Sequence, residues 1–147
     1  MISFDSNILI YAVDREAGER HEQAASLIER AIRANNCMQP LQTLCEFFTV
    51  ATRKIGLDPL VAQSFVEGWY AVIPVEPATM DDLANAMRAV RQYRLSFWDA
   101  MLWATVRRLG AQILLSEDFQ DGREIEGIRI ANPFFERNRP LIDAQAP

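Results

Sequence analysis

The chain contains few of the side chains on which many enzymes depend. Its 147 residues include one histidine, His21, and two cysteines, Cys37 and Cys45. Chemistry that needs two imidazoles, such as metal-free cleavage of RNA by a histidine pair, is therefore close to excluded. The cysteines match no metal-ligand spacing and suggest no disulfide scaffold, so we expect inert thiols in a reducing compartment. Carboxylates would have to carry any chemistry.

Long apolar runs and an excess of basic residues are also missing. No stretch approaches the roughly 18 apolar residues that span a bilayer, and the first residues lack the pattern of a secretory signal, so we expect a cytoplasmic protein. The formal net charge of −5 argues against broad, nonspecific binding of nucleic acid through a basic surface. A metal-dependent enzyme that acts on phosphodiesters is compatible with this charge, because bound cations invert the local field of an acidic site.

The sequence does contain an alternation of strand and helix patterns, over a length that suits one domain. Strands are predicted at residues 1–4, 37–39, 71–75, 111–116 and 127–133. Helices are predicted at residues 19–35, 40–55 and 96–109, with two more that begin near 59 and 79. This order predicts an α/β domain in which helices cover both faces of an open, mainly parallel sheet of four to five strands. We place the domain at residues 1–135 and expect a polar, loosely attached tail at 136–147.

Asp5 interrupts an apolar run in the opening segment MISFDSNILIYA. A carboxylate between two segments that are both expected to be buried is costly unless it is hydrogen-bonded, neutralised or bound to a cation. One interpretation is that Asp5 caps the helical turn that follows it. Ser6 and Asn7 would then complete the turn, or they would orient a carboxylate or a metal-bound water. The local sequence leaves both interpretations open.

Asp118 and Asp99 are further candidates for a site at one edge of this sheet. Ligands of open α/β sheets bind beyond the carboxyl ends of the strands, and Asp118, like Asp5, directly follows a predicted strand. Glu117 and Asp121 are close enough to substitute for it, although Asp121 also belongs to an Asp-Gly turn signal. Asp99 lies three residues after Ser96 in the first turn of a predicted helix, so it either completes a capping box or is functional.

Glu46 belongs to a predicted helix that is apolar around most of its circumference. Five apolar residues are predicted to lie on one face of this helix, as a stripe that contains Leu41, Leu44, Cys45, Phe48 and Ile55. Glu46 lies off this stripe, as is typical of a solvent-facing helical side chain. Because Phe47 and Val50 are also apolar, the helix is expected to make a second buried contact or to present a surface to a partner.

Four of these segments occur together in one known family. They are FDSN after the first strand, the glutamate of LCEF, SFWDA at the start of a later helix, and LLSEDFQDG after a strand. Together they resemble the PIN domain, and the similarity is closest to the ribonuclease toxins of bacterial VapBC toxin–antitoxin modules. The closing GIRIANPF is similar to the last strand of the family. The resemblance covers the chain from Met1 to about Phe135 and implies a three-layer α/β/α PIN-like fold.

The resemblance implies a metal-dependent active site made of carboxylates. The acidic quartet of the family is carried over to Asp5, Glu46, Asp99 and Asp118. Asp5, Asp99 and Asp118 would bind Mg²⁺, or Mn²⁺ in its place, because both cations suit an all-oxygen site. Glu46 would be a ligand or would orient the attacking water. The polar groups that would support these acids are Ser6, Asn7 and Ser116. The implied reaction is hydrolysis of RNA to a 5′-phosphate and a 3′-hydroxyl.

The resemblance also implies macromolecular partners. RNA is the expected substrate, with transfer RNA a typical target of the family, and a small antitoxin protein is the expected inhibitor. Toxins of this kind commonly form homodimers. Arg88, Arg91 and Arg94 recur at intervals of three and could follow a phosphate backbone, although cations near a helix end also favour the helix dipole. Residues that could contact a partner, or equally form ordinary core, are Phe47, Phe48, Val50, Trp69 and Tyr70.

Two other classes of protein fit parts of the pattern. A phosphatase with an aspartate nucleophile could use Asp5, but such enzymes usually need a second Asp two residues later, where this chain has Asn7. A receiver-type binding module needs an Asp at the end of its middle strand and a later Lys, whereas AVIPVEPAT offers only Glu76 and ILLSEDF has no Lys. Phosphorylation by a small phosphodonor would favour either alternative, and RNA cleavage would exclude both.

Overall fold

The centre of the fold is a four-stranded sheet, which the computed structural model describes together with the rest of residues 1–147. Its strands lie in the order β1 (Ile2–Phe4), β4 (Ile113–Leu115), β6 (Ile128–Ala131) and β5 (Glu124–Ile125). β1, β4 and β6 are parallel, whereas β5 runs antiparallel to β6. The prediction of a mainly parallel sheet is confirmed.

A second, two-stranded sheet lies next to β1 at the edge of the first sheet. β2 (Gln39–Pro40) pairs in parallel with β3 (Val75–Glu76), and an isolated parallel bridge between Ile2 and Cys37 joins β1 to the segment before β2. The strand predicted at 71–75 is wrong except at its last residue. The backbone amides of residues 71–73 bond back to Glu67 and Trp69 and close the preceding helix with a turn.

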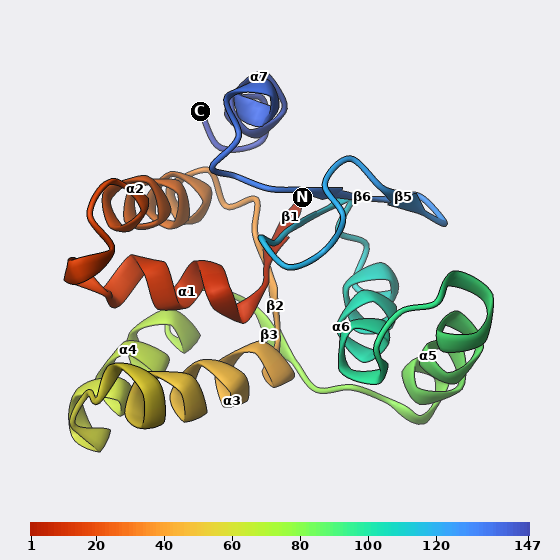
Figure 1. Ribbon diagram of the computed structural model, residues 1–147, viewed down its shortest axis with the longest axis horizontal. Coiled ribbons are helices and arrows are strands. Elements are labelled where there is room, and N and C mark those ends of the chain that lie inside the picture. The colour runs from red at the N-terminus through yellow and green to blue at the C-terminus, as the bar shows by residue number, and fades with distance from the viewer.

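Helices flank the sheet on both faces (Figure 1). One face carries α1 (Ser6–Val13), the 3-10 turn η1 (Arg15–Ala17), α2 (Glu19–Arg33), α3 (Leu41–Val50), the π-helical turn η2 (Ala51–Ile55) and α4 (Pro59–Tyr70). The other face carries α5 (Met80–Tyr93) and α6 (Phe97–Arg108). The chain closes with the 3-10 turn η3 (Glu136–Asn138) and α7 (Arg139–Asp143). None of these helices is both long and apolar enough to cross a membrane.

The alternation of side chains along the strands builds a separate core on each face of the sheet. Ile113 and Leu115 of β4 pack in a cluster with residues of α1–α4, whereas Leu114 packs in a second cluster with residues of α5 and α6. Trp103 of α6 is fully buried in the second cluster and donates its indole N–H to the carbonyl of Ile125 (3.1 Å). This arrangement confirms the three-layer α/β/α fold.

The predicted apolar stripe of α3 is wrong in part. Leu44 and Phe47 are buried, but Leu41 and Phe48 are 45% and 38% exposed, and Cys45 is exposed as well. The reason is that α1 and α4 cover only one side of α3, so about half of its apolar circumference is left at the surface. The expectation of a second apolar surface on this helix is therefore met, on a face that includes part of the stripe.

The C-terminal segment is packed against the domain, so the expectation of a loosely attached tail is wrong. Ile142 and Ala146 are 4% and 0% exposed and belong to the same core cluster as α2. The N-terminal ammonium group donates to Gln145 Oε1 (2.9 Å), and Arg30 of α2 donates to the carbonyl of Ala146 (2.7 Å). Two apolar residues and these polar contacts are sufficient to anchor a segment that is otherwise polar.

Candidate functional site

Asp5 lies at the carboxyl end of β1, where the backbone passes from strand to helix. Its amide donates to the carbonyl of Leu115 in β4 (2.8 Å), and its Oδ1 caps α1 by accepting from the amide of Ser6 (2.7 Å). Its other oxygen, Oδ2, accepts from Ser116 Oγ (2.6 Å) and from Asn7 Nδ2 (3.3 Å). Asp5 therefore caps the helix, and the same carboxylate is also held against the end of β4.

Burial changes the charge state of Asp5. The residue is 6% exposed, and loss of hydration raises the pKa of its carboxyl from 3.8 to about 6. The hydrogen bonds from Ser116 and from the Ser6 amide lower this pKa, while the negative charges of Glu46 and Asp118 raise it further. Asp5, Glu46 and Asp118 therefore share one electrostatic environment, although they come from three separate segments.

Asp118 is the least constrained of the three acids that follow β4. It is exposed, and its Oδ2 accepts from Asn7 Nδ2 (3.0 Å). Glu117 is bound by Tyr11 and Arg20 instead. Only Asp118 is free to face Asp5 from this loop.

Asp121 has a structural role in the same loop. It accepts from the amide of Asn132 (2.7 Å), from Arg137 Nε (2.9 Å) and from Asn138 Nδ2 (2.6 Å). Partial burial on its own raises the pKa of Asp121, but these hydrogen bonds outweigh it and hold the pKa below its ordinary value. The carboxylate thus fastens the loop to the segment after β6.

Glu46 and Asp99 border the site from α3 and α6. Gln42 Nε2 donates both to Glu46 Oε1 (2.7 Å) and to the carbonyl of Trp98 (3.0 Å), so one amide joins the two helices. The amide of Asp99 donates to Ser96 Oγ (3.3 Å), but the return bond from the amide of Ser96 to the Asp99 carboxylate does not form. Only half of the predicted capping box is present, and the carboxylate of Asp99 is left without a structural partner.

The polar groups of the site are of the chemical type that binds a hard cation. They are carboxylate, hydroxyl and amide groups, whose oxygens Mg²⁺ and Mn²⁺ accept as ligands, and the buried Asn7 Oδ1 has no hydrogen-bond partner. Asn7 Nδ2 bonds to a carboxylate oxygen of both Asp5 and Asp118, so its N–H groups offset the repulsion between them. No group of three or more His, Cys, Asp or Glu side chains is arranged to hold a metal ion. The donor chemistry therefore fits, and a cation held by one or two of these carboxylates would complete its coordination with water.

An apolar groove of about 650 Å³ lies beside these acids. Its walls include Ser6 and Glu46 of the candidate site together with Leu41, Gln42, Cys45, Thr49, Val50, Ala78 and Trp98. The side chain of Trp98 is largely uncovered, with 63% of the residue exposed. An uncovered apolar surface next to a polar site is typical of a binding surface.

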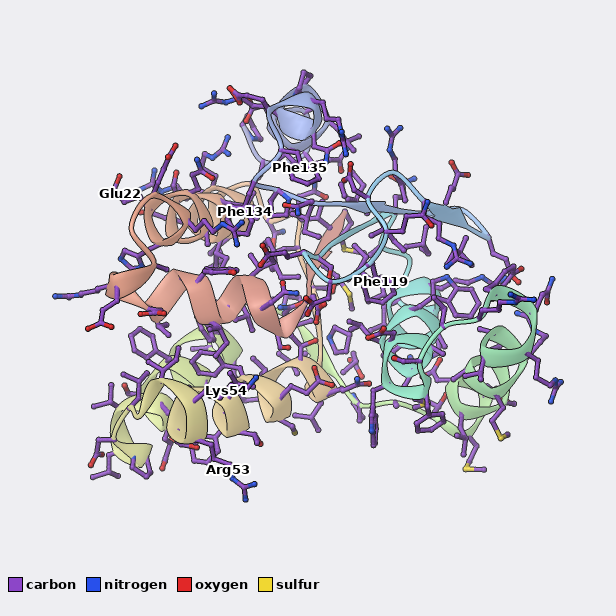
Figure 2. All side chains as sticks on the ribbon, in the orientation of Figure 1. Glu22, Arg53, Lys54, Phe119, Phe134 and Phe135 are labelled. Atoms are coloured by element: carbon purple, nitrogen blue, oxygen red, sulfur yellow. The ribbon has the colours of Figure 1, made fainter.

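The arginines predicted as RNA contacts differ in their surroundings. Arg88 donates to Glu126 (2.6 Å) and lies over the ring of Trp103, so it fastens the β5–β6 hairpin to α5 and α6. Arg91 and Arg94 are exposed, and Arg94 ends α5 in a left-handed conformation with φ of 56°. Arg53, in the π-helical turn η2, points away from the body of the domain (Figure 2).

One cation beside the loop that carries Asp118 was not predicted from the sequence. Arg20, near the start of α2, pairs with Glu117 and donates to Tyr11 Oη (2.8 Å). Tyr11 follows Asn7 by four residues and therefore lies on the same face of α1. This spacing is the signal that could have placed Tyr11 beside the loop that carries Asp118.

Comparisons with known proteins agree with this geometry. The family model described as PIN domain matches residues 2–121. VapC20 of Mycobacterium tuberculosis, a sarcin–ricin loop cleaving toxin, is 24% identical, and the similarity covers 80% of this chain and 90% of that chain with a TM-score of 0.63. A toxin–antitoxin complex from Klebsiella pneumoniae is 20% identical, with 91% and 98% covered and a TM-score of 0.65. DNA-bound VapBC from Salmonella typhimurium is 17% identical, with 90% and 97% covered and a TM-score of 0.63.

At these identities the similar structures establish a common fold, whereas the family model establishes descent. A comparison with curated protein sequences gives no match. The segment matched by the family model begins in β1 and ends after β4, so it contains Asp5, Glu46, Asp99 and Asp118. The chain belongs to the PIN domain family.

Proposed function

We propose that this chain is a Mg²⁺- or Mn²⁺-dependent endoribonuclease and the toxin of a VapBC-type toxin–antitoxin pair. The observation that carries the proposal is the environment of Asp5. This carboxylate is buried, and its pKa is raised to about 6 by burial and by the negative charges of Glu46 and Asp118. A shift of this size at a strand end, produced by burial and by acids from other segments, is typical of functional sites. The similarity to a sarcin–ricin loop cleaving toxin supports RNA as the substrate class.

In this proposal the metal ligands are Asp5, Asp99 and Asp118. A bound cation would lower the pKa of a water molecule and would stabilise charge on the scissile phosphate. Asp99 can join the other two because its carboxylate is not used by the helix that carries it. Asp118 can join because Asn7 already holds it next to Asp5.

The remaining polar groups of the site prepare these acids for the reaction. The amide of Ser6 and the hydroxyl of Ser116 each fix one oxygen of Asp5, which sets the orientation of the carboxylate. Gln42 holds Glu46 at the rim, where Glu46 orients the attacking water or joins the ligands. Hydrolysis would leave a 5′-phosphate and a 3′-hydroxyl, as the family resemblance implies.

We also infer three partners and a compartment. The RNA substrate, for which transfer RNA is the leading class, would approach past the exposed Arg91 and Arg94. A small antitoxin would cover the apolar groove beside Glu46, since toxin–antitoxin complexes are among the similar structures. A second copy of the chain would use another part of the exposed apolar surface. The protein would act in the cytoplasm.

The test is cleavage of a total transfer RNA pool by the purified protein with Mg²⁺ or Mn²⁺. We expect cleavage by the wild type that EDTA abolishes and Asp5→Asn lacks, while circular dichroism shows the same fold for both proteins. Asp81→Asn is the matched control, because Asp81 is an exposed acid whose carboxylate binds nothing in the first turn of α5. A fully active Asp5→Asn protein, or phosphorylation of Asp5 by acetyl phosphate without RNA cleavage, would contradict the proposal.

A further inference from the structure

Three side chains outside the proposed metal ligands hold the loop that carries Asp118. We propose that Tyr11, Arg20 and Glu117, which we call the Glu117 clasp, are positioning residues that set the place of Asp118 in the site. This inference rests on the proposed function, because it assigns the clasp a role in metal binding. None of the three side chains belongs to the acidic quartet.

The clasp joins α1, α2 and the loop after β4 through three direct contacts. Tyr11 Oη donates to Glu117 Oε2 (2.5 Å), Arg20 donates to Tyr11 Oη (2.8 Å), and Arg20 also forms an ion pair with Glu117. The guanidinium group of Arg20 lies 5.3 Å from the ring centre of Tyr11 and 5.1 Å from that of Phe134. Arg20 is therefore oriented by two rings as well as by a carboxylate.

The spacing on α1 explains how the clasp selects one acid over its neighbour. Asn7 and Tyr11 are four residues apart and lie on one face of the helix. Asn7 binds Asp118, and Tyr11 binds Glu117. Two side chains that are one turn apart on α1 therefore bind two adjacent acids of the loop. Because Glu117 is drawn toward Tyr11 and Arg20, Asp118 is the carboxylate that faces Asp5.

The loop is anchored on its other side by an apolar contact. Phe119 is 8% exposed and belongs to the core cluster that α5 and α6 form with the sheet. Figure 2 shows Phe119 on the α6 side of the loop, across from α1 and Phe134. Asp118 thus lies between a polar anchor at residue 117 and an apolar anchor at residue 119.

The clasp is too exposed to be explained by stability alone. The side chain of Arg20 is 46% exposed and that of Glu117 is 24% exposed, and ion pairs at such positions contribute little to folding. Placement of a metal ligand, by contrast, is sensitive to small displacements. Contacts that orient a ligand from outside the metal's own shell commonly change metal affinity or activity by about 10- to 100-fold.

The test compares Tyr11→Phe and Arg20→Met with the wild type in three measurements. Hydrogen exchange should be faster at residues 117–120 and unchanged in the strands. Calorimetry should show Mn²⁺ affinity lowered about tenfold, and kcat for RNA cleavage should fall about tenfold while KM changes less than about twofold. Arg33→Met is the matched control, since Arg33 forms an exposed ion pair with Glu29 on the same helix, α2, and should change none of these quantities.

Two results would overturn the inference. A raised KM with unchanged kcat and unchanged Mn²⁺ affinity would mean that Arg20 contacts RNA directly instead of positioning Asp118. Unchanged exchange at residues 117–120 in both variants would mean that the clasp does not hold the loop. Failure of the proposed function is recognised separately, because the wild type would then bind no Mn²⁺ and cleave no RNA, while faster exchange in the variants would still support the clasp.

Discussion

The starts of α5 and α6 carry the same local motif and use it differently. Thr79 and Asp82 form a complete capping box, in which the Thr79 hydroxyl accepts from the Asp82 amide (3.2 Å) and an Asp82 oxygen accepts from the Thr79 amide (2.9 Å). Ser96 and Asp99 have the same spacing, but only the hydroxyl half of the box forms. The carboxylate of Asp82 therefore caps its helix, whereas the carboxylate of Asp99 makes no capping bond.

The difference arises from tertiary partners and not from the motif. Asp82 is 1% exposed and receives Arg108 Nε at 2.8 and 3.0 Å, so its charge is balanced where it is buried. No cation is paired with Asp99. The same contrast separates Asp121, which is bound by Arg137 and Asn138, from Asp118. Asp82 and Asp121, which are paired with an arginine, hold the fold together, whereas Asp99 and Asp118, which are paired with no cation, are among the acids we propose for metal binding.

The largest effect is expected for the substitution Asp99→Asn. If the free carboxylate of Asp99 is a metal ligand, its loss should lower RNA cleavage about a thousandfold, which corresponds to roughly 4 kcal/mol of lost transition-state stabilisation. The melting temperature should stay close to that of the wild type, because the carboxylate makes no structural bond. Single-turnover cleavage and thermal melts of the same preparation check both expectations. Wild-type activity in this variant would remove Asp99 from the site.

The opposite result is expected for Asp82→Ala. Removing this acid breaks the capping box and takes the carboxylate partner from the partly exposed Arg108, so the free energy of unfolding should fall by about 2 to 3 kcal/mol. Urea denaturation followed by circular dichroism measures this loss. RNA cleavage per folded molecule should be unchanged. A variant as stable as the wild type would show that the Asp82 carboxylate contributes nothing to the fold.

Asp118→Asn and Asp121→Asn provide the same comparison within one loop. We expect Asp118→Asn to lower cleavage about a hundredfold with little change in stability. Asp121→Asn should instead lower the free energy of unfolding by about 1 to 2 kcal/mol, because the amide cannot accept every bond that Asn132, Arg137 and Asn138 donate. Cleavage assays and melts of both proteins check the assignment, and a reversed pattern would make Asp121 the functional acid.

Asp5→Asn should show a smaller, pH-dependent gain in stability. Because the pKa of Asp5 is raised to about 6, the folded state binds its proton more tightly than the unfolded state does. The stability contributed by this group is complete below 3.8, is lost as the pH rises through about 6, and is constant above that value. At about pH 8 the variant should therefore be more stable than the wild type by about 2 to 3 kcal/mol, and at about pH 4 the two should be nearly equal.

Denaturant melts at the two pH values, without divalent metal, test this expectation. Added Mg²⁺ should stabilise the wild type at the higher pH and leave Asp5→Asn unchanged, because the cation compensates the buried charge. A pH-independent difference between the two proteins would show that Asp5 does not titrate with a raised pKa.

Elements defined by local patterns were predicted well from the sequence. The parallel strands β1, β4 and β6 and the starts of α4, α5 and α6 follow from apolar periodicity and capping residues, which act within a few positions. The β5–β6 hairpin was missed, because its turn uses Glu126 with a positive φ and is fixed by Arg88 of α5. The exposed half of α3 and the packed C-terminus were missed as well, since burial depends on which helices lie nearby.

The sequence by itself determined that carboxylates must carry the chemistry and where four candidates lie in the order of elements. It could not decide which acids are free, because a charged side chain is bound or unbound according to partners that are distant along the chain. Arg20 and Glu117 are 97 residues apart, and Ser116 and Asp5 are 111 apart. Only the tertiary structure brings these groups together, buries Asp5, and leaves Asp118 and Asp99 without a paired cation.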